Sequence, residues 1–299
     1  MRILVLGANG QVGTALRSSL PARFGSSLDL QIATRSGSLD GAPCHVADFS
    51  DLASLDELVR SVSPDVVINA AAYTAVDKAE TDVEAARTAN ELAPGVLGVA
   101  CAALGIPLVH YSTDYVFDGS ATSPYKPNHP TAPLGVYGRT KLDGELAIAA
   151  SGCTYVILRT AWVYGNTGHN FMRTMLRLGA ERSELSVVSD QIGCPTPAWL
   201  IADVTAEIIA QGITNSATHH VVTSGQTSWA GFADAIFELA FARGLLASRP
   251  VVRPITSAEY PTPAERPKYS VLDTFSLETD YEIKVPAWTD ALAETLGNM

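Results

Sequence analysis

Residues 1–13 read MRILVLGANGQVG, an apolar run that leads directly into three closely spaced glycines. The aliphatic run at 3–6 predicts a buried strand, and TALRSSL after Gly13 predicts a helix. A glycine turn between a strand and a helix lets backbone amides approach a pyrophosphate at the helix N-terminus. The segment therefore predicts a dinucleotide-binding unit, with a purely structural glycine turn as the alternative.

Outward from this segment, short β-branched runs alternate with amphipathic stretches through the first half of the chain. The runs are 3–6, 30–33, 65–70, 106–112 and 154–160. This alternation predicts an α/β fold with a Rossmann-type doubly wound parallel sheet, because parallel strands need crossover helices that cover both faces. Between two of the runs, DLASLDELVRSV (51–62) predicts a helix with an inward leucine stripe, and Ser50 is its expected cap.

The regular alternation fades after about residue 165. Helices are expected near 170–182, 197–211 and 229–246, with the loop SVVSDQIGCPTP between the first two and a proline-rich tail around 250–267. We expect a dinucleotide-binding domain over residues 1–165, with a return of the chain to the sheet near 195–222. The substrate domain, a smaller mixed α/β cap, is then built from 166–194 and 223–299.

Composition and charge narrow the function classes. The chain has 299 residues, 47% of them hydrophobic, and a net charge of −11 without a basic stripe, which disfavours nucleic acid and anionic membranes as partners. The first apolar run breaks at Gly7, too early for a signal peptide, so a cytoplasmic location is expected. The four cysteines stand singly and the six histidines lack ligand spacing, which predicts reduced thiols and no metal site.

The end of the second expected strand bears on cofactor choice. An acidic residue here would hold the ribose hydroxyls of NAD, but the chain has Thr34, Arg35 and Ser36. Arg35 can pair with a 2′-phosphate, so NADPH is expected to be preferred, with NADH possible as a cofactor. The alternative is a solvent-facing arginine without a ligand. Asp48, after the next short strand, is a candidate partner for adenine.

Later in the chain, Thr113, Tyr137 and Lys141 are the residues expected to carry out the chemistry. Thr113 lies at the carboxyl edge of the strand in 106–117, where ligands bind in open α/β sheets. Tyr137 and Lys141 are four apart at the start of the next expected helix, a spacing that is common on any helix. We expect Tyr137 to donate a proton to a carbonyl oxygen that Thr113 hydrogen-bonds. Lys141 is expected to hold the cofactor ribose and to lower the tyrosine pKa.

Several blocks together carry a resemblance to a known family. GANGQVG, NAAAYTAVDKAE, HYSTDYVFDG, VYGRTKLDGE and RTAWVYG occur in this order, followed by TMLRLGAERSELSVVSDQIGCPT and YPTPAERPKYSVLD in the cap region. Over nearly the whole chain the sequence resembles the extended short-chain dehydrogenase/reductase family. That resemblance makes Thr113, Tyr137 and Lys141 the catalytic set.

The resemblance also implies contact residues. Cofactor contacts are expected at Gly7, Asn9, Gly10, Gln11, Val12, Gly13, Arg35, Asp48, Phe49, Ala71, Ala72, Tyr73, Thr74, Tyr111, Tyr137 and Lys141. Substrate contacts are expected at Thr113, Asp114, Tyr137, Trp162, Gln191, with its neighbour Asp190, and Arg266. The alternative for Trp162 is a core aromatic, and for Arg266 a surface ion pair.

The reaction implied by the resemblance is reduction of the 4-keto group of dTDP-4-dehydro-6-deoxy-L-mannose by NAD(P)H, giving dTDP-L-rhamnose for cell-surface polysaccharide such as lipopolysaccharide. One alternative is a nucleotide-sugar 4-epimerase or 4,6-dehydratase, although such dehydratases follow the threonine with Asp-Glu and this chain has Asp114-Tyr115. Another is a non-catalytic regulatory subunit of the same fold. Thymidine against uridine and the product stereochemistry stay open.

The resemblance bears on assembly as well. Some bacterial members dimerise around magnesium held by glutamates at positions that fall near Ala15, Trp199 and Thr289 in this chain, and none of these is acidic. Magnesium needs oxygen ligands that alanine and tryptophan lack. A monomer without bound metal is therefore expected, with a metal-free dimer as the alternative.

Overall fold

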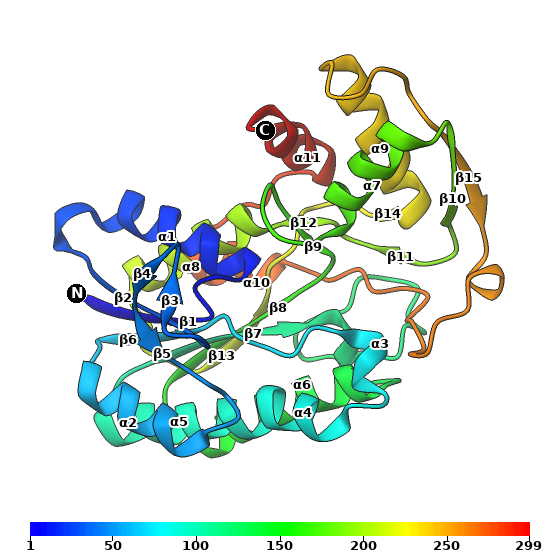
Figure 1. The fold of residues 1–299 in the computed structure, drawn as a ribbon. Helices are drawn as coiled ribbons and strands as arrows, with labels where there is room; N and C mark the ends of the chain where they lie inside the picture. The colour runs from blue at the N-terminus through cyan, green and yellow to red at the C-terminus, as the bar shows by residue number, and fades with distance from the viewer.

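A seven-stranded parallel sheet organises the molecule, and the computed structural model describes all residues from 1 to 299. Its strand order is β13-β8-β7-β6-β1-β2-β5 (Figure 1). The strands are β1 (Arg2–Leu6), β2 (Asp29–Thr34), β5 (His45–Val46), β6 (Val66–Asn69), β7 (Leu108–Thr113), β8 (Tyr155–Thr160) and β13 (Ala217–His220). All neighbouring pairs are parallel, as expected for a doubly wound sheet. The predicted fold class is confirmed.

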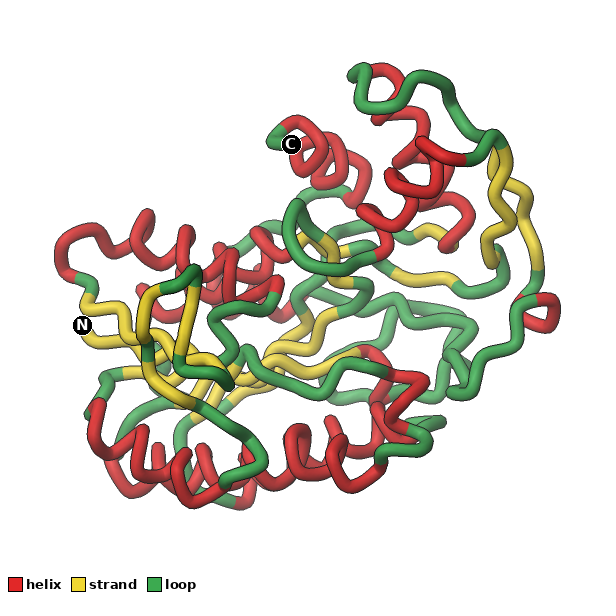
Figure 2. Tube along the Cα trace, in the orientation of Figure 1, coloured by secondary structure: helices red, strands yellow, loops and turns green.

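Helices cover both faces of this sheet, as Figure 2 shows in red around the yellow strands. One face is covered by α1 (Gln11–Phe24), α8 (Ala198–Gln211) and α10 (Phe275–Tyr281). The other carries α2 (Leu52–Val62), α5 (Ala93–Leu104) and α6 (Val136–Ala150), extended by α3 (Val76–Ala79), α4 (Val83–Arg87) and the π-helical turn η2 (Thr88–Leu92). Successive side chains of β1 enter opposite cores, since Ile3 and Val5 pack under α1 while Leu4 and Leu6 pack under α2.

The remaining segments form the cap. Helices α7 (Phe171–Glu181), α9 (Trp229–Ala242) and α11 (Trp288–Gly297) share one apolar cluster with the parallel pair β10 (Glu184–Val188) and β15 (Val251–Ile255). Short pairs join it to the sheet: β9 (Val163–Tyr164) with β12 (Thr196–Pro197), and β11 (Ile192–Gly193) with β14 (Thr227–Ser228). The hairpin β3 (Ser38–Leu39) and β4 (Ala42–Pro43) and the short turns η1 (Gly25–Ser27), η3 (Asp114–Val116) and η4 (Ser257–Glu259) complete the chain.

Between the cap segments, the chain returns to the sheet through α8 and β13. Helix α8 packs against α1, and β13 pairs in parallel with β8. This path matches the range expected for the return, while the division into two domains stays a prediction. In Figure 1 the cap helices α7, α9 and α11 stand above one end of the sheet.

One local expectation is wrong. The cap of α2 is Asp51, whose carboxylate accepts the backbone N–H of Ser54 at 3.4 Å. Ser50 instead donates its hydroxyl to Asp48 at 2.8 Å. The inward stripe of this helix is present, because Leu55, Leu58 and Val59 are buried.

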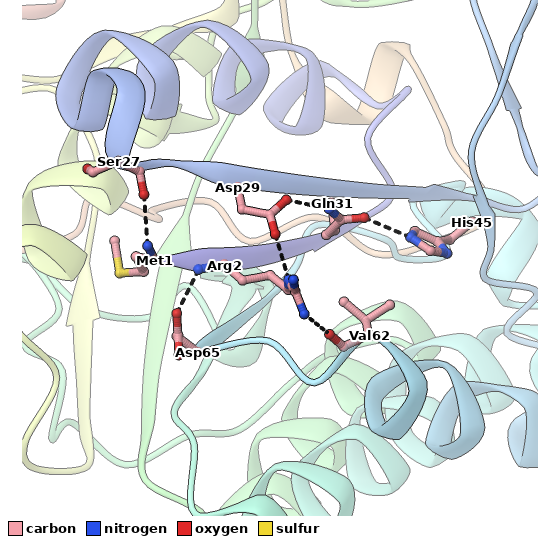
Figure 3. A network of polar contacts seen from close by, with 8 residues as sticks. All are labelled: Met1, Arg2, Ser27, Asp29, Gln31, His45, Val62 and Asp65. Atoms are coloured by element: carbon pink, nitrogen blue, oxygen red, sulfur yellow. Dashed lines mark hydrogen bonds and ion pairs between the residues drawn. The ribbon is translucent and has the colours of Figure 1, made fainter.

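A polar network closes the amino end of the sheet (Figure 3). Arg2 binds Asp29 at 2.7 Å and the carbonyl of Val62 at 2.9 Å, and its backbone N–H donates to Asp65 at 2.6 Å. The network links the starts of β1, β2 and β6. These ion pairs are largely exposed and contribute little to stability, so the functional groups must be sought at the opposite, carboxyl edge.

Candidate active site

The glycines of the turn after β1 let the protein backbone pack closely around the start of α1. Gly7 has φ +79°, and a Cβ there would lie 2.6 Å from the amide nitrogen of Ala71. A Cβ on Gly13 would lie 2.1 Å from the carbonyl oxygen of Gly7. Helix α1 begins at Gln11 with no side-chain cap, so its first amides are available to an anion. The turn therefore fits a pyrophosphate.

This turn lies at the point where the strand order reverses. The chain runs from β1 outward to β2 and β5, and then returns to the other side of β1 with β6. Ligands of doubly wound sheets bind at such a switch point. The loop after β6, which carries Ala71, Ala72, Tyr73 and Thr74, is directly beside the glycine turn.

That loop is held by a buried asparagine. Asn90, in the π-helical turn η2, accepts the backbone N–H of Tyr73 at 2.9 Å. Its amide donates to the carbonyl of Tyr73 at 3.1 Å and to the hydroxyl of Thr140 at 3.2 Å. Thr140 lies on α6 next to Lys141, so one side chain links the loop to the helix that carries the expected chemistry. The sequence analysis missed Asn90, since nothing local in TANEL marks it.

At the end of β2, Arg35 pairs with Asp48. The two side chains are 3.5 Å apart, and Arg35 is 81% exposed. Hydrogen bonds from the backbone and hydroxyl of Ser50 lower the pKa of Asp48, and Arg35 lowers it further. The structure thus brings the expected phosphate partner and the expected adenine partner together on the exposed rim beside the glycine turn.

The three expected catalytic residues come from adjacent elements. Thr113 is the last residue of β7, while Tyr137 and Lys141 lie on the first turns of α6. Thr113 and Lys141 are buried, and Tyr137 is half-buried. Gly138 allows the close packing of α6, because a Cβ there would lie 2.1 Å from the carbonyl oxygen of Tyr115. The end of β7 and the first turns of α6 thus carry the three residues, with Thr113 within hydrogen-bond reach of Tyr137, and their catalytic roles stay predictions.

The electrostatics of Tyr137 differ from the prediction. Burial raises the pKa of Tyr137 to about 12, the Thr113 hydroxyl lowers it in part, and Asp114 raises it. Lys141 does not shift it, and its Nζ instead donates to the carbonyl of Tyr111 at 2.6 Å and lies 3.2 Å from Nε2 of His110. The expected lowering of the tyrosine pKa by Lys141 is therefore wrong for this arrangement. The high pKa keeps Tyr137 protonated, which suits a proton donor.

Asp114 is a buried carboxylate beside this set. Its Oδ1 accepts the Thr113 hydroxyl at 3.0 Å, and its Oδ2 is buried without a partner of good hydrogen-bond geometry. Burial raises the pKa of Asp114 to about 6, although the nearby hydroxyls of Ser270 and Thr113 oppose the shift. A buried oxygen that lacks a partner is costly unless a ligand supplies one, which fits the predicted sugar contact.

Trp162 lies in the left-handed backbone region with φ +48°, which is strained for an aromatic residue. Its ring stacks on Trp229 with centroids 3.6 Å apart, and Gly193 leaves no room for a Cβ against it. Trp229 in turn donates to Gln191 at 3.2 Å, which donates to Ser257 at 2.9 Å. Trp162 and Gln191 are therefore joined through one side chain of the cap, which sequence reasoning missed.

Arg266 reaches the site from the cap side. Its guanidinium binds Asp77 at 2.8 Å, lies 5.7 Å from the ring centre of Tyr115, and keeps Nη1 buried without a partner. Tyr115 contacts Tyr137 edge to face, with centroids 5.6 Å apart. Arg266 does form an ion pair, but with 17% of its side chain exposed it is not a plain surface pair. A ligand with a hydrogen-bond acceptor would satisfy the unpaired N–H groups of Nη1.

The side chains of two expected cofactor contacts are committed to the core. Phe49 is 8% exposed and packs with the cluster under α2. Tyr111 shares its hydroxyl with Thr205 of α8 at 2.8 Å, and only its backbone carbonyl reaches Lys141. Their expected contacts with a cofactor stay predictions.

A groove of about 650 Å³ lies elsewhere on the molecule. It is lined by Leu52, Ala53, Asp56, Arg60, Glu91, Leu92, Gly95, Val96, Val99 and Ala147. None of the expected site residues borders it, so the candidate active site is the polar carboxyl edge. No helix of the structure is long and apolar enough to cross a membrane.

Comparison with known proteins gives the family. The family model described as RmlD substrate binding domain matches residues 1–299. A dTDP-4-dehydrorhamnose reductase of Burkholderia thailandensis is 45% identical, covering 98% of this chain and 97% of its own. The chain belongs to the dTDP-4-dehydrorhamnose reductase family. The resemblance inferred from the sequence motifs is thereby confirmed.

Solved structures of this reductase family have the same fold. The structure from Clostridium acetobutylicum is 37% identical with a TM-score of 0.89, and covers 100% of this chain and 99% of its own. The structure from Bacillus anthracis, in complex with NADP, is 32% identical with a TM-score of 0.90, at the same coverage. The similarity therefore includes the cap as well as the sheet.

The three positions considered for magnesium lie in different environments in this reductase. Ala15 packs at the edge of the α1 core, and Thr289 is exposed in the first turn of α11. Trp199 is half-buried and donates its indole N–H to the Thr295 hydroxyl at 3.0 Å. Trp199 thus ties α8 to α11 within the chain, while the expected absence of metal and the monomeric state stay predictions.

Proposed function

We propose that this protein reduces the 4-keto group of dTDP-4-dehydro-6-deoxy-L-mannose with NADPH, giving dTDP-L-rhamnose, and that NADH is a poorer substitute. The observation that carries the proposal is the placement of Thr113, Tyr137 and Lys141 at the carboxyl edge, beside a glycine turn shaped for a pyrophosphate. The family supports it, since the related protein of Bacillus anthracis binds NADP and the curated relatives are dTDP-4-dehydrorhamnose reductases.

The cofactor side of the proposal rests on residues that fit such a molecule. The uncapped start of α1 would hold the pyrophosphate, and Arg35 would pair with a 2′-phosphate. The nicotinamide, when bound, supplies a hydride. Lys141 would hold the neighbouring ribose, since the adjacent Thr140 is linked through Asn90 to the loop after β6.

On the substrate side, the chain's own groups hold and supply a proton. Tyr137 keeps its proton at neutral pH, so its hydroxyl can donate to a carbonyl oxygen that becomes an alkoxide. The Thr113 hydroxyl lies within hydrogen-bond reach of Tyr137, and Asp114 Oδ2 is free to accept a sugar hydroxyl. Arg266 and the Trp162, Trp229 and Gln191 group would contact the nucleotide part from the cap.

The test is turnover of the purified chain with the dTDP-4-keto sugar, followed as loss of NADPH absorbance and as product. One NADPH should be consumed per sugar reduced. Tyr137→Phe should lower turnover by about 10² or more while leaving NADPH affinity nearly intact, since only the proton donor is removed. A variant that keeps more than about half of wild-type turnover, with chemistry rate-limiting, would show that Tyr137 is not the donor.

The same assay separates the alternatives. A 4-epimerase or 4,6-dehydratase would convert sugar without net loss of NADPH, whereas a regulatory subunit would convert nothing. A uridine analogue of the sugar, used in parallel, would decide which base the cap accepts. The cytoplasmic location stays a prediction from the sequence.

A further inference from the structure

Lys141 is the end of a buried polar chain that crosses from β6 to α6. Its Nζ lies 3.2 Å from Nε2 of His110, on β7. Nδ1 of the same ring lies 3.1 Å from the side-chain nitrogen of Asn69, on β6. The side chains are buried, with 1%, 0% and 2% exposure for Asn69, His110 and Lys141. Their polar atoms must therefore bond to one another, because water does not reach them.

The direction of each hydrogen bond follows from one backbone amide. Ala71 donates its N–H to Oδ1 of Asn69 at 3.1 Å, which orients the asparagine so that its NH₂ group faces His110. The NH₂ can only donate, so Nδ1 of His110 must accept. A neutral imidazole carries one proton, and here that proton must be on Nε2. Burial lowers the pKa of His110, which keeps the ring neutral.

The conflict arises at Lys141. The Nε2–H of His110 points at an amine that, as an ammonium, offers only N–H groups in return. If Lys141 were an ammonium, its N–H groups would face the Nε2–H of His110, and neither group could accept a hydrogen bond. A neutral amine resolves the clash, because one N–H donates to the Tyr111 carbonyl and the lone pair accepts from His110.

We propose that Asn69 and His110 act as positioning residues that fix one imidazole tautomer and thereby bias Lys141 toward its neutral amine. Proton loss from the ammonium then leaves a network in which every donor has an acceptor. Burial independently lowers the pKa of Lys141 to about 8, with Glu145 opposing. Both effects place the change of charge close to neutral pH. The inference deepens the proposed function, because Lys141 belongs to the same site.

The other ionisable groups around α6 do not replace this control. Glu145, one turn after Lys141, is held by Arg159 of β8 at 2.6 and 2.9 Å, so its charge is already compensated. Helix α5 contributes only the buried thiol of Cys101, whose pKa is raised by burial. The charged groups of the other neighbouring segments are engaged elsewhere: Asp77 with Arg266, Lys78 with Asp82, Glu80 with the Val136 amide, Arg87 with Glu91, and Asp114 with Thr113.

The first experiment observes the tautomer without any assay of activity. Protein labelled with ¹⁵N at histidine is examined by two-bond ¹H–¹⁵N NMR between pH 6 and 9, and His110→Gln identifies the resonance. The inference expects a neutral ring with its proton on Nε2 throughout. A proton on Nδ1, or a ring that becomes charged in this range, would overturn it, whatever the protein turns out to reduce.

The second experiment reverses the hydrogen bonds. Asn69→Asp would accept from Nδ1–H and leave Nε2 as an acceptor for the ammonium. His110→Gln can offer its amide oxygen to the same ammonium without adding charge. Both variants should move the alkaline limb of the kcat/KM profile, and of NADPH affinity, upward by about one pH unit or more, since each favours the charged amine.

The matched control is His220→Gln. His220 is a buried histidine of β13, two strands from β7 in the sheet order, and its Nδ1 bonds the Asp273 carbonyl. It shares no hydrogen bond with Lys141, so its loss should leave the limb in place. A fall in kcat with unshifted limbs in both Asn69→Asp and His110→Gln would reduce the pair to a structural role and overturn the inference. Absence of turnover with any sugar would instead count against the proposed function, because the NMR and NADPH-binding results do not depend on it.

Discussion

Glu80 caps the helix that carries Tyr137, and its removal is the sharpest test of how the site is positioned. Helix α6 begins at Val136 with Gly135 as a cap residue that has no side chain to offer. Glu80, just after α3, accepts the N–H of Val136 at 2.8 Å, and a Cβ on Gly135 would lie 2.5 Å from the same carboxylate oxygen. A distant carboxylate thus replaces the missing cap and complements the positive end of the helix dipole.

The size of the effect follows from this contact. A hydrogen bond to a charged group contributes about 1.5–3 kcal/mol, and loss of an N-cap costs about 0.5–2 kcal/mol. Because Glu80 is only half-buried, we expect Glu80→Ala to destabilise the protein by about 1.5 kcal/mol. For a chain of this size that lowers Tm by about 3 °C. Tyr137 lies in the affected turn, so kcat should fall about 10-fold through loss of orientation.

Three variants measured together make the test specific. Glu80→Gln keeps an acceptor oxygen for the Val136 amide and should retain kcat within about 3-fold. Glu84→Ala removes an exposed glutamate of the adjoining helix and should match wild type. Thermal unfolding, steady-state kinetics and NADPH titration are the measurements, with NADPH affinity unchanged throughout. Equal kcat and Tm in Glu80→Ala and Glu84→Ala would refute the capping argument.

Three further predictions concern the cofactor, the buried carboxylate and the metal. Arg35→Ala should weaken the binding of NADPH by about 1–3 kcal/mol and leave the binding of NADH almost unaffected. Equal losses of affinity for the two cofactors in titrations would contradict this. The folded-state pKa of Asp114, about 6, lies above its ordinary value, so the native protein binds the extra proton between about pH 4 and 6 and loses stability as pH rises through that window. Asp114→Asn should therefore raise stability by up to about 3 kcal/mol above pH 6 and by little below pH 4, which unfolding at several pH values would check. EDTA should leave activity and sedimentation unchanged. A dimer that appears only with magnesium would contradict this, because it would show that metal-dependent dimerisation does not need carboxylates at the three considered positions.

Much of the fold could be predicted because its signals are local. Strands β1, β2, β6, β7 and β8 each fall on a short apolar run, and the glycine turn follows β1 within a few residues, so periodicity and glycine spacing predicted them. Thr113 was expected at a strand end, and β7 ends there. The strands after residue 165 left no such signal. β15, which contains Pro254, and β13 exist because β10 and β8 offer edges to pair with.

Small polar choices were decided by competition between neighbours. Ser50 is a good capping residue, yet Asp48 takes its hydroxyl and Asp51 becomes the cap of α2. The sequence alone is compatible with either Ser50 or Asp51 as the cap of this helix, and the path of the backbone decides between them.

By itself, then, the sequence determined the order of the main elements and the glycine turn, because each depends on residues close together in the chain. It also marked three candidate catalytic residues, whose roles stay predictions. The tertiary structure alone decided the surroundings that set their chemistry: Asn69 and His110 under Lys141, Asp77 beside Arg266, Glu80 at the start of α6, and Asn90 across the loop. These partners are separated from the groups they hold by 17 to 189 positions, from Asn90 and Tyr73 to Asp77 and Arg266. Protonation state, burial and orientation arise from such long-range contacts, and no local pattern of residue types specifies them.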